Sequence, residues 1–165
     1  MSILLFAFRC RIFAFMSDVL EMCDRFIKLS LSNLMQDIFS RFDVRWFVIE
    51  LNTKEQLYEK GIDSKGKSLG DYAPFTIDRK IDSGLPYDRI TLFETGEFYE
   101  SFEVKVYKED IEIVANPDKF DTKTGKKSNL YEDFGIDIVG LTDENTVKLQ
   151  EYLLPLIQAE IMKLI

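Results

Sequence analysis

Apolar residues recur every three or four positions in the N-terminal part of the chain, which is the spacing of an amphipathic helix. Between residues 18 and 42 they form the pairs Val19/Leu20, Met22/Cys23, Phe26/Ile27, Leu34/Met35 and Ile38/Phe39, followed by Phe42. We therefore predict one helix over this range. A second helix is predicted from about Val44 to Lys60, because Gly61 stands where a glycine commonly ends a helix.

In the middle of the chain the pattern changes to the alternation of apolar and polar residues that is typical of strands. The segments SFEVKVY (101–107) and DIEIVAN (110–116) alternate in this way, and Lys108-Glu109 joins them as an antiparallel hairpin. Before them, residues 75–82 are predicted to form a short helix, and Thr95 is the expected N-cap of a short turn.

The polar residues 116–129 predict a mobile loop, because few apolar side chains are available to fix it. A short strand is predicted within DFGIDIVGLT (133–142), and Thr142 is expected to cap a final helix that runs to about Leu164 and contains Pro155 as a kink or a restart. This order of elements predicts an α+β fold with N-terminal helices, a central antiparallel β-hairpin or small sheet, and a C-terminal helix.

The chain has 165 residues, which is enough for one domain with a proper core. Its first fifteen residues are mostly apolar, and Met16-Ser17-Asp18 after them resembles a second protein start. Both arginines lie inside the apolar run, which does not fit a signal peptide, and the run is too short and too charged to cross a bilayer. We expect residues 1–15 to be a non-native extension, residues 16–165 to form a single α+β domain, and no membrane to be involved.

Charge and residue usage narrow the possible functions. Acidic residues outnumber basic ones 29 to 21, and the absence of a basic block argues against specific nucleic-acid binding. The chain has no histidine, which is the commonest general base and metal ligand. Cys10 and Cys23 are spaced unlike a metal or redox motif and are interpreted as reduced cysteines of a cytosolic protein. We therefore predict no catalytic residue, no cofactor and no metal site.

One segment resembles a nucleotide-binding loop. Residues 61–68, GIDSKGKS, which begin with Gly61 and end with Ser68, fit the pattern G-x-x-x-x-G-K-[ST]. A phosphate-binding loop needs a buried strand before it and a helix after it, whereas the preceding residues are predicted to be helical and Gly70 and Pro74 follow. We interpret the segment as a polar loop that leaves a helix. The alternative is a small nucleotide-dependent or metal-dependent enzyme that uses this loop or an acidic cluster.

Five short motifs between residues 61 and 149 occur in a recognisable order. They are Gly66 with Gly70; Tyr72 with Pro74, Thr76 and Lys80; Leu92, Thr95, Gly96, Phe98, Ser101 and Phe102; Phe134-Gly135; and Gly140-Leu141-Thr142. In this order and spacing the chain resembles the phage virion-morphogenesis and tail-completion proteins of tailed phages and prophages. It departs from their pattern at Tyr72, where many members carry Trp, and at Asp137-Ile138, which often is Pro-Arg.

The resemblance implies a structural, non-enzymatic role. Such neck proteins are α+β subunits that assemble as rings between the capsid portal and the tail tube, and thereby join head and tail. The expected partners are further copies of the chain and the portal, connector or tail-tube proteins. The expected location is the virion, and the host cytoplasm before assembly.

Two groups of residues are candidates for the assembly interface. The first group is Tyr72, Phe75, Thr95, Gly96 and Phe98, and the second is the lysines Lys119, Lys123, Lys126 and Lys127 of the polar segment. For the aromatic residues we favour core packing over an assembly surface, and for Thr95-Gly96 a cap and the relief of a steric clash. The polar segment is expected to become ordered on a neighbour, with its lysines as candidates to meet an acidic patch there.

Overall fold

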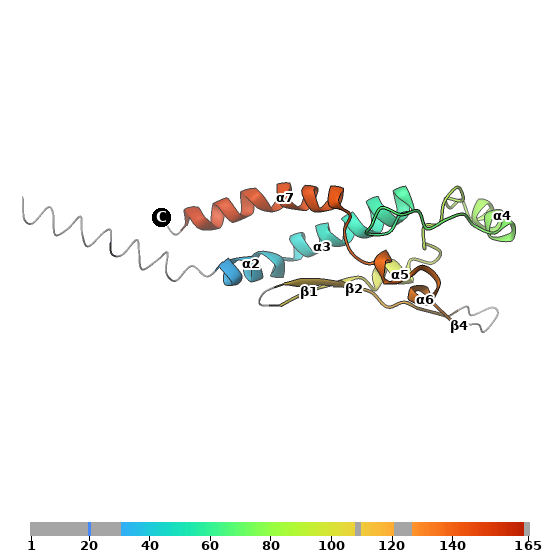
Figure 1. The fold of residues 1–165 in the computed structure, drawn as a ribbon, viewed down its shortest axis with the longest axis horizontal. Helices are drawn as coiled ribbons and strands as arrows, with labels where there is room; N and C mark the ends of the chain where they lie inside the picture. The colour runs from blue at the N-terminus through green and yellow to red at the C-terminus, as the bar shows by residue number, and fades with distance from the viewer. Residues whose placement is uncertain (1–19, 21–30, 108–109, 121–126, 164–165) are drawn as a thin grey trace, which may run out of the picture.

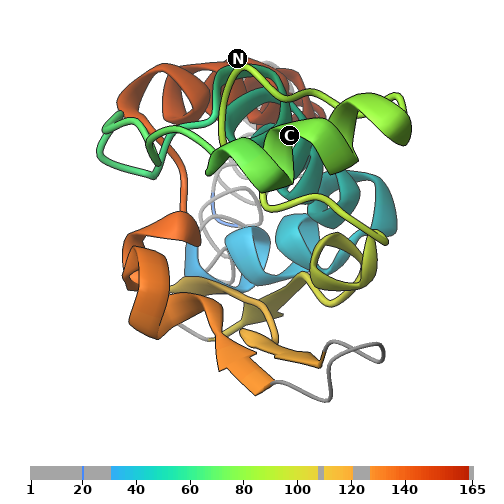
Figure 2. The same ribbon diagram turned by 90° about the vertical axis from the view of Figure 1, so that its right-hand side faces the viewer.

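The computed structural model describes residues 20, 31–107, 110–120 and 127–163. The molecule is elongated and has three layers: helix α7 (Asp143–Met162) on one side, helices α2 (Leu31–Ser40) and α3 (Phe42–Glu50) in the middle, and a β-hairpin on the other side (Figure 1). Helix α4 (Pro74–Asp82) and a second, smaller hairpin lie at the end away from the C-terminus (Figures 1 and 2). The fold is α+β, as predicted from the order of elements.

The N-terminal helix predicted to run to Phe42 is interrupted earlier. Arg41 has an extended backbone, with φ −67° and ψ 137°, and separates α2 from α3. Its guanidinium binds the carboxylate of Asp43 at 2.8 Å, in the first turn of α3. The apolar spacing continues across this break, which is why the sequence pattern did not reveal it. Residues 18–19 and 21–30 of the predicted helix lie outside the described part of the chain.

The second predicted helix ends where expected. Helix α3 continues into a π-helical stretch, η1 (Leu51–Lys60), and Gly61 ends it with a left-handed backbone at φ 62° and ψ 41°. A Cβ atom at this position would lie 2.9 Å from the carbonyl oxygen of Ile90. Gly61 is therefore required both by its backbone conformation and by the close approach of another segment.

The three layers enclose two groups of buried apolar residues. The larger group joins α2, α3, strand β1 and α7, and consists of Leu34, Ile38, Phe39, Val44, Val48, Leu51, Val104, Leu149 and Leu153. The smaller group consists of Leu57, Phe102, Leu130 and Ile138. Burying a side chain of this size contributes about 1.5–3 kcal/mol to stability. Helix α4 contributes no residue to either group of buried residues.

The predicted central hairpin is confirmed. Strands β1 (Glu103–Val106) and β2 (Ile111–Val114) pair antiparallel, with Val104 opposite Ile113. Val104 faces the core, whereas Glu103 and Lys105 are exposed, in agreement with the alternation of the sequence. Lys108-Glu109, the predicted connection, lies outside the described residues.

The prediction of one mobile loop over residues 116–129 is wrong for its ends. Strands β3 (Asp118–Phe120) and β4 (Lys127–Asn129) pair antiparallel there, with Asp118 opposite Asn129. The Asn129 side chain donates a hydrogen bond of 2.9 Å to the Asp118 carboxylate and also caps the next helix, α6 (Leu130–Phe134). These strands are short and polar, so that no apolar period reveals them. Residues 121–126 lie outside the described part.

The strand predicted within residues 133–142 is also wrong. Helix α6 ends at Gly135, and a 3-10 turn, η2 (Ile136–Ile138), follows. Ile138 is fully buried, whereas Ile136 is 70% exposed. The two apolar residues therefore do not share one face, as they would in a strand, because they lie in a 3-10 turn.

The remaining helices agree more closely with the sequence. Helix α4 begins one residue before the predicted range, and the Thr142 hydroxyl caps α7 by accepting a 3.3 Å hydrogen bond from the Asn145 N–H. Pro155 lies inside α7. The N-cap of helix α5 (Glu97–Glu100) is Gly96 and not Thr95 as predicted, although the Thr95 hydroxyl accepts a 3.5 Å hydrogen bond from the Glu97 N–H. Among the described helices, none has the length and hydrophobicity needed to cross a bilayer.

Candidate assembly surface

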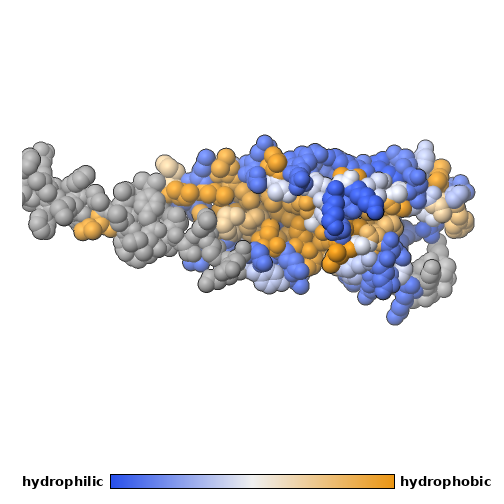
Figure 3. Space-filling view, viewed as in Figure 1, coloured by the Kyte–Doolittle hydropathy of each residue, from blue (hydrophilic) through white to orange (hydrophobic). Residues whose placement is uncertain are grey.

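Helix α4 buries one charged side chain and exposes two large apolar ones, whereas its other charged residues are exposed as usual. Helices at a protein surface normally bury their apolar residues and expose their charged ones. In α4 the side chain of Lys80 is only 4% exposed, whereas Phe75 is 78% and Ile81 is 51% exposed. Figure 3 shows apolar surface at the end of the molecule where α4 lies. The outer face of α4 is therefore a candidate contact surface.

Lys80 connects α4 to the segments that precede and follow it. Its ammonium group donates a hydrogen bond to the carbonyl oxygen of Phe93 and lies 5.2 Å from the centre of the Tyr72 ring. A buried ammonium group is costly unless it has such partners, and the electron-rich face of an aromatic ring attracts a cation. The helix is thus held by a charged residue, and its phenylalanine is left to face the solvent.

Glu94 connects α4 with the second hairpin. Its carboxylate binds the guanidinium of Arg79 on α4 at 2.8 Å and the ammonium group of Lys119 on β3. The hydrogen bond from Lys119 is the main cause that lowers the pKa of the Glu94 carboxyl, and the charges of Lys119 and Arg79 lower it further, against the opposing effect of burial. Helix α4 and strand β3 are thereby joined into one surface.

Thr91 lies beneath this surface and is fully buried. The Tyr72 hydroxyl accepts a hydrogen bond of 3.0 Å from the Thr91 N–H and lies 3.2 Å from the Thr91 hydroxyl. The Tyr99 hydroxyl donates a 2.5 Å hydrogen bond to the Thr91 carbonyl oxygen. Burial raises the pKa of the Tyr99 hydroxyl far above its ordinary value, so that it stays a neutral donor. The hydroxyl groups of both tyrosines therefore form hydrogen bonds within the protein.

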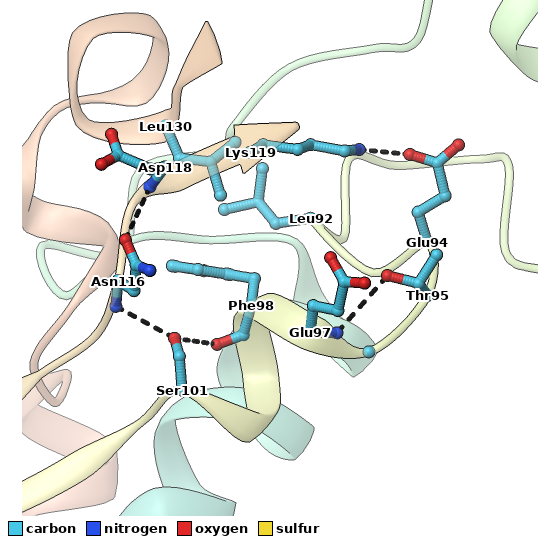
Figure 4. Close-up of a pocket in the computed structure, with 11 residues that line it drawn as sticks. Leu92, Glu94, Thr95, Glu97, Phe98, Ser101, Asn116, Asp118, Lys119 and Leu130 are labelled. Carbon is cyan, nitrogen blue, oxygen red and sulfur yellow. Dashed lines mark hydrogen bonds and ion pairs between the residues drawn. The ribbon is translucent and has the colours of Figure 1, made fainter. Parts of the chain in front are cut away.

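A small pocket of about 130 Å³ lies between α5 and the start of the second hairpin (Figure 4). Leu92, Phe98 and Leu130 give it apolar walls, and Glu94, Thr95, Glu97, Ser101, Asn116, Asp118 and Lys119 add polar groups. The Ser101 hydroxyl fixes one wall, because it donates to the Phe98 carbonyl at 2.7 Å and accepts from the Asn116 N–H at 3.0 Å. Pockets for drug-sized ligands usually measure about 300–1,000 Å³, so this one suits a side chain or a few water molecules.

The structure brings some of the predicted interface residues together and separates others. Thr95, Gly96, Phe98 and Lys119 all line this pocket, and Lys127 lines an adjacent hollow next to Lys119. Phe75 lies apart from them on α4, and Tyr72 is half-buried beneath it. Lys123 and Lys126 lie outside the described residues. Lys119 binds Glu94 of its own chain, which differs from the expected contact with a neighbour.

The core-packing interpretation holds for part of the aromatic group. Phe98 is half-buried and packs edge to face against the buried Phe102, with ring centres 5.1 Å apart, but Phe75 is exposed. A Cβ atom at Gly96 would make only ordinary contacts with neighbouring segments, the nearest at 3.6 Å from the Phe93 ring, so that the steric requirement for glycine does not come from a neighbour. Its left-handed φ of 93° is the feature that requires glycine.

The sequence analysis missed the roles of Lys80, Arg79 and Glu94. Lys80 follows Ile77 by three positions, on the helix face where an amphipathic pattern calls for an apolar residue. That mismatch was the available sign that this lysine is buried. Glu94 carried no comparable sign, because its two partners lie 15 residues before it and 25 residues after it.

In the segment that resembles a phosphate-binding loop, the carboxylate of Asp63 binds the backbone N–H groups of the loop. The Asp63 side chain, 7% exposed, accepts hydrogen bonds from the backbone N–H groups of Lys65 and Lys67 at 2.9 and 2.8 Å. In a phosphate-binding loop such N–H groups surround the phosphate. A helix precedes the segment and no helix follows before α4, which confirms the predicted flanks.

Carboxylates elsewhere on the described surface do not gather into a site. Within the described ranges, no group of three or more His, Cys, Asp or Glu side chains is arranged to hold a metal ion. Glu112, for example, accepts a 3.1 Å hydrogen bond from the Tyr107 hydroxyl across the first hairpin.

Comparisons with known proteins add no relative: no family model, no curated protein and no solved structure matches the chain. The resemblance to phage tail-completion proteins therefore rests on the five motifs of the sequence.

Proposed function

We propose that this protein is a non-enzymatic structural component of a tailed-phage or prophage particle, where it assembles as a ring that joins head and tail. The outer face of α4 is a contact surface of that ring. The observation that carries the proposal is that α4 buries Lys80 and exposes Phe75 and Ile81. Contact with a neighbour removes the Phe75 ring from water, which is the favourable change that the free subunit lacks.

Apolar side chains on another helix support a subunit that works in contact with others. Val147, Leu154 and Met162 on α7 are each more than half exposed. They are separated by seven and eight residues, a spacing that places them along one side of the helix. Single exposed apolar residues are ordinary, whereas a row of them favours a contact surface.

The charge of the chain fits a neck ring through which DNA passes. The formal net charge is −8, and a channel wall with negative charge repels phosphate, so that the genome does not adhere to it. A basic lumen would bind the DNA backbone and slow its passage.

The test compares the wild-type chain with Phe75→Ala by light scattering and negative-stain imaging, alone and together with candidate portal and tail-tube proteins. Phe42→Ala is the matched control, because Phe42 is 76% exposed and lies on α3, away from α4. We expect ring-sized particles for the wild type and the control, and their loss in Phe75→Ala. Unchanged assembly of Phe75→Ala would contradict the role of α4.

A separate measurement addresses the enzyme hypothesis. A nucleotide at a hundred times its Kd would stabilise the protein by about 2.7 kcal/mol. We expect Mg²⁺-ATP and Mg²⁺-GTP to leave the melting temperature unchanged. A clear increase that Lys67→Ala abolishes would overturn the structural role in favour of nucleotide chemistry at residues 61–68.

A further inference from the structure

The first hairpin has an open edge. Strand β1 pairs only with β2 in a two-stranded sheet, so its other side has no strand beside it in the described structure. An open edge presents a row of backbone N–H and C=O groups that another strand can pair with.

The backbone groups on this edge belong to Val104 and Val106. The Tyr107 N–H donates to the Asp110 carbonyl at 2.9 Å, which makes these two residues a hydrogen-bonded pair across the hairpin. Antiparallel pairs alternate between hydrogen-bonded and non-hydrogen-bonded, so that Lys105 and Glu103 also bond toward β2. Val104 and Val106 therefore direct their N–H and C=O groups to the open edge. Among the described residues, neither N–H donates to a backbone carbonyl outside the hairpin.

A shallow hollow runs along this edge. It is lined by β1 itself, Tyr107, Ser40 of α2 and Arg45 of α3. The hollow leaves room for an incoming strand beside β1.

From these features we infer that β1 pairs with β1 of a second copy of this chain, antiparallel, with Val104 opposite Val104 of the second copy. In this register Glu103 of each chain faces Lys105 of the other, on the exposed side of the sheet. Opposite charges that face each other across strands stabilise the pairing. Of the two neighbouring registers, the one with Val104 opposite Val106 of the second copy brings the two Lys105 side chains together, and the one with Val104 opposite Phe102 brings the two Glu103 side chains together, so that both are disfavoured.

The charges already present in the hairpin extend this arrangement. Lys105 lies opposite Glu112 within its own chain. In the paired sheet each Lys105 would therefore lie between Glu112 of its own chain and Glu103 of the second copy. Charged residues on an edge strand usually prevent pairing with another strand. Here the two-fold axis places Glu103 of each chain opposite Lys105 of the other, so that the charges are complementary. This inference does not depend on the phage role or on α4.

The test uses charge reversal in the full chain. Glu103→Lys gives a chain with lysine at both positions, and Lys105→Glu gives a chain with glutamate at both. Each variant alone is expected to lose the self-pairing, whereas a mixture of the two regains it, because every facing pair is then opposite in charge. The main readout is the hydrogen exchange of the Val104 and Val106 amides. The mass is measured by light scattering in chains that also carry Phe75→Ala, in which the contacts through α4 are removed and the pair has twice the 19.3 kDa of one chain.

Amide exchange separates this pairing from contacts made through α4. We expect the Val104 and Val106 amides to be protected in the wild type and in the mixture, and to exchange rapidly in each variant alone, with melting temperatures measured to check that the variants are folded. Rapid exchange of both amides in the wild type at high concentration would overturn the inference. Equal protection in wild type, both single variants and the mixture would overturn it as well.

Discussion

The side chain of Asn52 accepts a hydrogen bond of 2.9 Å from the backbone N–H of Gly140, which lies 88 residues further along the chain. Its amide also donates to the carbonyl oxygen of Ile138 at 3.2 Å. One turn later, Gln56 repeats the arrangement by donating to the Gly140 carbonyl and accepting from the Thr142 N–H, both at 3.0 Å. Two buried side chains of η1 thus bind the segment before α7 as a neighbouring strand would.

Asn52→Ala is expected to destabilise the protein substantially. The substitution leaves the Ile138 carbonyl and the Gly140 N–H buried without partners, and each unsatisfied group costs about 1–3 kcal/mol. We expect a loss of at least about 2 kcal/mol in the free energy of unfolding, measured by urea denaturation. Asn33→Ala, an exposed position on α2, is the control and should change stability by less than about 0.5 kcal/mol. A loss no larger than that of the control would show that the contacts of Asn52 are replaced by water.

Within residues 61–68, stability is expected to depend on Asp63 and not on the residues that define the nucleotide-binding pattern. Lys67 and Ser68 are exposed, so Lys67→Ala and Ser68→Ala should each change the free energy of unfolding by less than about 0.5 kcal/mol. Asp63→Ala removes the acceptor of two backbone N–H groups and should cost about 1.5–3 kcal/mol. Thermal and denaturant unfolding of the three variants side by side provide the measurement. The reverse order of sensitivity would contradict the structural account of this loop.

Tyr72→Phe tests whether this residue supports the fold or an interface. The substitution keeps the ring beside Lys80 but leaves the Thr91 N–H without its acceptor. We expect a loss of about 1–3 kcal/mol in unfolding free energy. Tyr87→Phe removes a hydroxyl from a side chain that is 50% exposed and should be nearly silent. Should Tyr72→Phe retain full stability but fail to assemble, Tyr72 would be an interface residue.

The contribution of Glu94 to stability is expected to decrease in acid. Its pKa in the folded protein lies below the ordinary value of 4.5, so that its ion pairs stabilise the fold above that pH. As the pH falls through the lowered pKa, the carboxyl becomes protonated in both states and the contribution disappears. The Glu94 side chain is 30% exposed, and screening by solvent keeps its contribution to about 1 kcal/mol.

The measurement for Glu94 compares the wild type with Glu94→Gln. The difference in unfolding free energy should be positive at pH 7, decrease below about pH 4.5, and level off once the pH is below the lowered pKa. A difference that stays constant from pH 7 to pH 3 would show that Glu94 does not act through its charge.

Local patterns in the sequence determined several elements of this protein. The end of the helix at Gly61 follows from a glycine with a left-handed backbone, and the start of α7 follows from the Thr142 hydroxyl as its cap. The β1–β2 hairpin follows from the alternation of apolar and polar residues. Each of these depends on residues within a few positions of one another, so the information is present in a short stretch of chain.

Only the tertiary structure decided the segments whose partners are distant in sequence. The backbone near Gly140 is held by Asn52 and Gln56 of a distant helix, which is why its apolar alternation did not produce a strand. Lys80 is buried because the Phe93 carbonyl and the Tyr72 ring lie where its ammonium group can reach them. A polar side chain is buried when its hydrogen bonds are satisfied there, and the groups that satisfy them are brought together only by the complete fold.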